Sequence, residues 1–146
     1  MAVVITVSNH WKYQLGKKAV DVSADTFKVI LMDDTFAFDK DAHATLDDVI
    51  ASPSKELATG FGYTRQNKEL AGGSWAEDDV NDKGVREFDN VTWTASGGAI
   101  GPTGAAVVYD DTSADKTVVG CIDFGTDFTI PDGSSFQIQS IAIEVE

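Results

Sequence analysis

The sequence predicts a mainly β protein, an antiparallel β-sandwich or barrel-like fold with one or two short helical turns. About eight or nine short β-prone segments are separated by turn residues, without the long helical patterns of a βαβ fold. Two apolar runs, Ala105–Tyr109 and Val118–Phe124, flank a polar loop and are typical of a β-hairpin. Because both runs are apolar on nearly every residue, we expect a covered central hairpin that buries Val107, Val108, Val119 and Ile122.

Length and composition indicate one domain over residues 1–146. The chain is 42% hydrophobic, which is enough for a core and too much for a disordered chain. No apolar run approaches the ~20 residues of a membrane-spanning helix. The first residues lack a basic region and a cleavage site typical of a signal peptide, so we expect synthesis and use from the cytosol. Cys121 has no second cysteine to pair with, and its apolar surroundings indicate a buried thiol.

The excess of acidic residues disfavours two classes of binding partner. The net charge is −13, from 24 acidic and 11 basic residues. This argues against binding to a nucleic-acid backbone or to an anionic membrane surface, both of which need clustered Lys and Arg. It favours solubility, or docking to a partner with basic patches.

The N-terminal third contains two predicted strands and a helical turn. Ala2–Val7 is β-branched, and Ser8 or Asn9 then caps a turn of helix over His10–Lys18. Thr26–Met32 is the next strand, and its side chains alternate in direction. One face carries Phe27, Val29 and Leu31, and the other carries Ile30 and Met32.

Residues 33–53 form an acidic arm or long loop. Thr45 and Asp48 resemble a capping box that starts a helical turn through Ile50, which Pro53 ends. The apolar side chains of this segment need cover, so we expect an ordered arm rather than a linker.

The remaining chain supplies further strands. Glu56–Tyr63 contains two glycines around an aromatic residue and indicates a bend. Ser96–Gly104 is a glycine-rich loop leading into the hairpin. Phe136–Glu146 alternates with a one-residue change of phase, which predicts one strand containing a β-bulge. The other expected strands are Lys68–Leu70, Ser74–Ala76, Val85–Phe88 and Val91–Thr94.

No pattern of catalysis or of metal binding emerges from the sequence. His10 and His43 lie far apart, and neither has a metal-binding spacing to Cys121. Nucleophile and phosphate-loop motifs are missing, and the clustered aspartates lack calcium-loop spacing, so we expect solvated acidic loops. The predictions are no enzyme activity, no cofactor and no metal. Trp75, which follows two glycines, is a candidate sugar platform, whereas Trp93 alternates with threonines and is expected in the core.

Five motifs in order resemble one family. They are FKVILM at 27–32, TGFGYT at 59–64, VTW at 91–93, AVVYDDT at 106–112 and IDFG at 122–125. Together they resemble a family of small structural proteins of tailed-bacteriophage virions. The resemblance implies a virion protein without catalysis, made in the host cytoplasm and present as a homo-oligomer or in many copies. A capsid decoration (cement) protein bound to the major capsid protein is the leading interpretation. A tail, neck or fibre-associated protein bound to another virion protein is the alternative, and a carbohydrate-binding module is an alternative of another class.

Two segments are predicted to contact the partner. Residues 1–8 form a candidate strand that pairs with a neighbour's sheet edge, and the arm at 33–53 places apolar residues among aspartates. The opposing interpretation is that both segments fold back on their own sandwich. The candidate interface residues are Val3, Val4, Ile5, Val7, Trp11, Phe36, Phe38 and Ile50.

Overall fold

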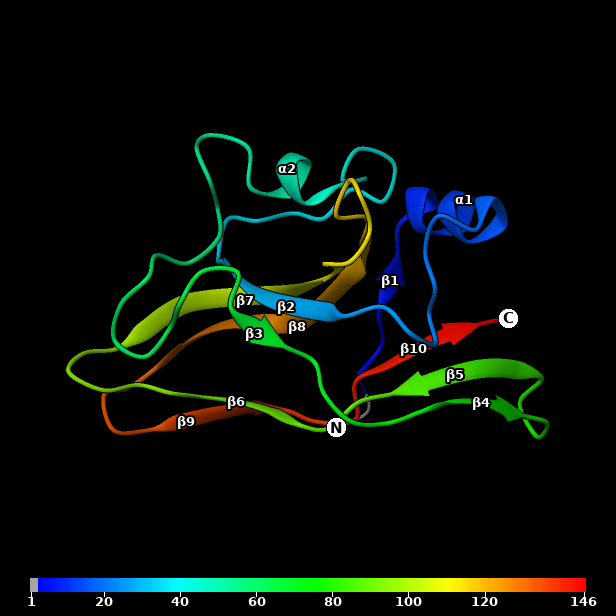
Figure 1. Cartoon of the computed structure of the whole chain (residues 1–146). Helices are drawn as coiled ribbons and strands as arrows, with labels where there is room; N and C mark the ends of the chain where they lie inside the picture. Colours follow the sequence, from blue (N-terminus) through cyan, green and yellow to red (C-terminus); the bar gives the residue numbers. More distant parts are fainter. Residues whose placement is uncertain (1–2) are drawn as a thin grey trace.

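The computed structural model describes residues 3–146 and confirms the mainly β prediction, with 42% strand and 9% helix (Figure 1). Over these residues the strands form separate antiparallel sheets of five, three and two strands rather than one closed barrel. The helices are α1 (Asn9–Lys17) and α2 (Leu46–Val49). The strands are β1 (Thr6–Val7), β2 (Phe27–Asp33), β3 (Lys68–Glu69), β4 (Trp75–Asp78), β5 (Lys83–Glu87), β6 (Val91–Thr94), β7 (Ile100–Asp110), β8 (Val118–Ile130), β9 (Ser135–Ile138) and β10 (Ala142–Val145).

The predicted hairpin is the centre of the five-stranded sheet. Strands β7 and β8 lie inside the order β1-β8-β7-β2-β3, with Val107 opposite Cys121. The four side chains predicted to be buried are at most 2% exposed, which confirms the prediction: Val107, Val108, Val119 and Ile122.

Strand β7 starts earlier than predicted. The loop expected at Ser96–Gly104 is wrong from Ile100 onward, because Ile100 pairs with Ile130 and Thr103 pairs with Phe128. The register of β7 against β8 shifts twice across this stretch. Gly101 and Gly104 therefore lie in an irregular part of the strand, whereas Gly97 and Gly98 precede it. Ile100 and Thr103 are both buried, and their burial explains why the stretch joins the sheet.

Strand β2 separates two cores by its alternation, as predicted. Phe27, Val29 and Leu31 face the first core, which lies between the five-stranded sheet and the two smaller sheets. Ile30 and Met32 face the second core, where residues 33–53 cover the opposite side of the sheet. Figure 1 shows these layers, with α2 and the arm on one side of β2, β7 and β8 and with β6-β9 and β10-β5-β4 on the other.

The C-terminal β-bulge prediction is wrong. Strand β9 pairs with β6, and β10 pairs with β5 in a different sheet. Between them Ser140 has a φ of 56°, so the chain turns sharply and changes partner. The phase change in the sequence therefore marks a break between two strands.

A glycine in the turn before β4 permits a close backbone approach. Gly73 has a φ of 69°, and a Cβ there would lie 1.5 Å from the carbonyl oxygen of Glu87. Gly97 has a φ of 79° but nothing within 4 Å of its Cβ position. We therefore expect Gly73→Ala to lower the free energy of unfolding by at least about 2 kcal/mol more than Gly97→Ala, which carries only the cost of a positive φ. Urea unfolding of both variants measures the difference, and equal losses would contradict the close approach.

Candidate partner-binding site

A groove of about 670 Å³ lies between the N-terminal segment and β10. Residues 3–7 form one wall, and residues 142–146 form the other. Trp11, Lys12 and Leu15 of α1 also line it, together with Lys40 from the arm. The groove thus brings together segments from opposite ends of the described chain, and we call it the β10 groove.

The wall at residues 3–7 is held by the central hairpin. Thr6 pairs with Cys121 and Val7 with Gly120, where a Cβ would lie 2.2 Å from the carbonyl oxygen of Thr6. Thr6 and Val7 therefore pair with their own sheet on one side, but β1 is an edge strand, so the pairing of residues 1–8 with a neighbour stays a prediction. The first residues, Met1 and Ala2, lie outside the described residues, and Val3–Ile5 continues beyond the paired part without strand structure.

Helix α1 is fixed beside the groove by polar contacts at its N-terminus. The Ser8 hydroxyl accepts from the Trp11 backbone N–H at 3.0 Å and donates to the Val118 carbonyl at 2.5 Å, so the predicted cap is confirmed. His10 Nε2 lies 2.8 Å from Asp115 Oδ2, which ties the helix to the hairpin loop. Hydrogen bonds from Ser8 and His10 therefore join the start of α1 to strand β8 and the hairpin loop.

The predicted N-terminal contact residues differ in exposure. Val4 is 78% exposed. Val3, Ile5 and Val7 are half-buried and pack against the first core. Trp11 is 1% exposed and packs edge-on to Phe27, with ring centroids 5.9 Å apart, so its assignment as an exposed contact is corrected to a core role.

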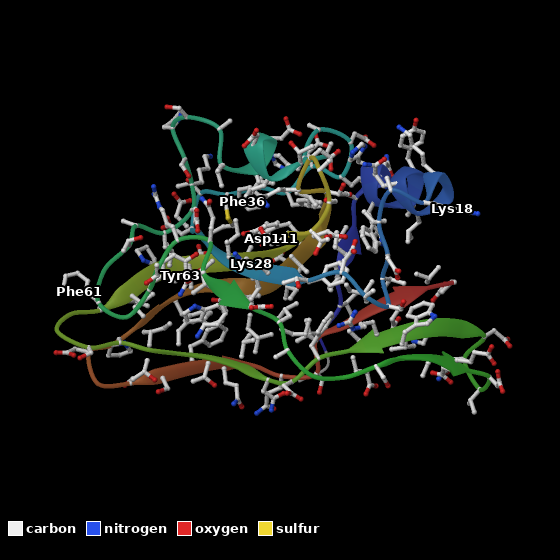
Figure 2. All side chains as sticks on the ribbon, in the orientation of Figure 1. Lys18, Lys28, Phe36, Phe61, Tyr63 and Asp111 are labelled. Atoms are coloured by element: carbon white, nitrogen blue, oxygen red, sulfur yellow. The ribbon has the colours of Figure 1, made fainter. Side chains whose placement is uncertain are left out.

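The predicted arm contacts face their own sheet. Phe36, Phe38 and Ile50 pack against the second core, and Figure 2 shows Phe36 between the arm and the sheet. The His43 ring lies against Phe36, with centroids 5.2 Å apart, and Asp39 N–H donates to its Nδ1. The arm thus folds back, as the opposing interpretation expected, and these three side chains do not line the β10 groove.

The capping box at the start of α2 is confirmed. Thr45 N–H and its hydroxyl both donate to Asp48 Oδ2, at 2.9 and 3.0 Å. The helix places Leu46 and Val49 in the second core. The box therefore fixes the part of the arm that covers β2 and β7.

The candidate sugar platform is separate from the groove. Trp75 is 38% exposed on the edge strand β4. Its ring lies against Gly84, where a Cβ would be 2.3 Å from Cη2. Trp93, as predicted, belongs to the core at 2% exposure.

Asp110 is a buried acid that sequence reasoning placed in a solvated loop. The residue is 0% exposed, Oδ1 accepts from the N–H groups of Thr112 and Ser113, and Oδ2 has no hydrogen-bond partner. Burial and the neighbouring Asp25 carboxyl raise the pKa of Asp110 to about 8. An Asp with Thr and Ser two and three positions later is an Asx-turn signal, which predicts the bonds of Oδ1 but not the burial of the side chain.

The next residue has the opposite environment. Hydrogen bonds from Lys116 and Lys28 hold the pKa of Asp111 below its ordinary value. Lys28 Nζ lies 3.3 Å from Asp111 Oδ2, and Figure 2 shows the two side chains close together. At neutral pH the raised pKa of Asp110 favours its protonated form, and the lowered pKa of Asp111 favours its charged form.

Within residues 3–146 no three His, Cys, Asp or Glu side chains gather as metal ligands. No helix in the same range has the length and apolar character to cross a membrane. Comparisons with protein-family models, with curated proteins and with solved structures found no match for this chain.

Proposed function

We propose that this chain is a structural protein of a tailed-bacteriophage virion, a capsid decoration protein that binds the outside of the assembled head and catalyses no reaction. The observation that carries the proposal is the β10 groove, a partly apolar surface beside an unpaired strand edge. The five sequence motifs that resemble virion proteins support the same role.

A decoration protein needs affinity for the assembled shell above its affinity for free subunits. Binding of that kind stabilises the assembled state by mass action. The net charge of −13 keeps free copies soluble and apart, and it steers them toward basic patches on a shell. The role therefore requires one surface that binds the shell on a domain that otherwise stays in solution. The β10 groove is our candidate for that surface.

Binding to particles assembled without this chain tests the proposal. We expect the purified protein to sediment with such particles and to raise the temperature at which they break open. Val4→Asp places a charge on the exposed rim of the groove and is expected to weaken binding at least tenfold. Val80→Asp is the matched control, because Val80 is 90% exposed and does not line the groove.

Three outcomes would count against the proposal. Sedimentation of the wild-type protein apart from the particles would contradict a virion role. Equal binding by the two variants would remove the groove from the contact. Electron microscopy of gold-labelled protein on tails or necks would replace the decoration role with the tail-associated alternative.

The exposed Trp75 ring favours one second candidate, a carbohydrate-binding module. Aromatic faces stack on sugar rings, and Trp75 is the only tryptophan of the described residues that is not buried. A glycan array with the wild-type and Trp75→Ala proteins tests it. Binding that disappears in the variant would support this module, and an empty array would exclude the glycans tested.

A further inference from the structure

We propose that the β10 groove takes an extended segment of the partner protein, which adds as a strand to the free edge of β10 and places a carboxylate beside Lys12 and Lys40. This inference rests on the proposed function, because it names the part of the virion partner that the groove would hold.

The backbone of β10 supplies the first argument. Strand β10 is at the end of the order β10-β5-β4, and all of its ladder partners are on β5. Within residues 3–146 no backbone hydrogen bond joins β10 to the facing wall at residues 3–7. Its four residues therefore offer about 13 Å of open strand edge, which an extended segment can pair with.

The side chains around this edge supply the second argument. Val3, Ile5 and Val7 of one wall and Val145 of the other are half-buried and keep some apolar surface, whereas Ile143 is 1% exposed and belongs to the first core. Because neighbouring side chains of a strand point to opposite faces, an occupant with β-branched residues would bury them against these walls.

The charged side chains that line the groove indicate the charge of the segment that would bind there. Lys12 and Lys40 are exposed and make no ion pair with another described residue, although the chain has more than twice as many acids as bases. On the opposite wall Glu144 is engaged by Lys83 at 2.7 Å, and Glu146 is the one lining carboxylate without an ion pair among the described residues, so the two lysines outnumber it. The groove therefore leaves lysine charge unmatched, which favours an apolar segment carrying Asp or Glu over a basic one.

Charge reversal with a matched control tests the carboxylate. Lys12→Glu with Lys40→Glu is compared with Lys17→Glu with Lys18→Glu, two exposed lysines outside the lining. Both double variants change the net charge equally, and their melting temperatures confirm folding. We expect at least a tenfold loss of affinity for particles assembled without this chain in the first double variant, and less than a twofold loss in the second.

Hydrogen exchange tests the strand addition on the same samples. The amides of residues 142–146 should exchange at least tenfold more slowly in the particle-bound wild-type protein than in the free protein. Equal affinities of the two double variants, or unchanged exchange at 142–146 in bound protein, would overturn the inference while leaving the virion role intact. Failure of the wild-type protein to bind would instead refute the proposed function, and the inference with it.

Discussion

The Val108→Asp protein is expected not to fold, whereas the Val80→Asp protein is expected to melt like the wild type. Val108 is 0% exposed in β7, packs in the first core and lies opposite Gly120 on β8. A carboxylate there would be buried without a partner, at a cost of several kcal/mol, which is about the whole stability of a small domain. Val80 is 90% exposed, so the same substitution there leaves the aspartate in water.

Expression and melting measure this difference. We expect Val108→Asp in the insoluble fraction, or without a cooperative transition by circular dichroism. We expect Val80→Asp within about 0.5 kcal/mol of the wild-type free energy of unfolding. A soluble Val108→Asp protein with a cooperative transition would contradict the central position of β7.

Asp110→Asn is expected to stabilise the protein at alkaline pH. Because the pKa of Asp110 is raised from 3.8 to about 8, the folded state holds more protons than the unfolded state between these values. The free energy of unfolding of the wild type should therefore fall as the pH rises from about 4 to 8, and then level off. Asparagine keeps the acceptor for Thr112 and Ser113 but cannot ionise. Its advantage in stability over the wild type should therefore grow by on the order of 3–4 kcal/mol between pH 5 and pH 8, at about 1.4 kcal/mol for each pH unit.

Asp111→Asn is the matched control for this experiment. The pKa of Asp111 is lowered in the folded state, so its stabilising contribution is present at neutral pH and is lost on acidification. Its removal should therefore lower stability at neutral pH and leave the decline toward pH 8 in place. Urea unfolding from pH 4 to 9 compares the three proteins, and a decline that persists in Asp110→Asn would show that another group causes it.

Local patterns in the sequence predicted the layers well. The alternation of Phe27 to Met32 sorted these side chains between the two cores, and the doubly apolar hairpin predicted its own burial on both faces. The cap at Ser8 and the box at Thr45 were readable because each depends on residues within one turn.

Long-range geometry was not readable from the sequence. A phase change between Ile138 and Ile141 looks the same in a bulged strand and in two strands, and only the partners β6 and β5 distinguish them. The terminal apolar run before Trp11 predicts a partner contact for this residue, and only its packing on Phe27 reveals a core role. The β10 groove joins residues 3–7 to 142–146, and no local pattern encodes that meeting.

The pairing of β1 with β8 sets the order of events during synthesis. The hydroxyl of Ser8 bonds to the carbonyl of Val118, 110 positions later, and Thr6 pairs with Cys121. A ribosome adding ~5–20 residues per second needs roughly 6–22 seconds to cover that separation, so the N-terminal wall stays without its sheet for that time. The second wall, β10, emerges later still. Until residues 142–146 have been made, a nascent chain therefore has no complete β10 groove.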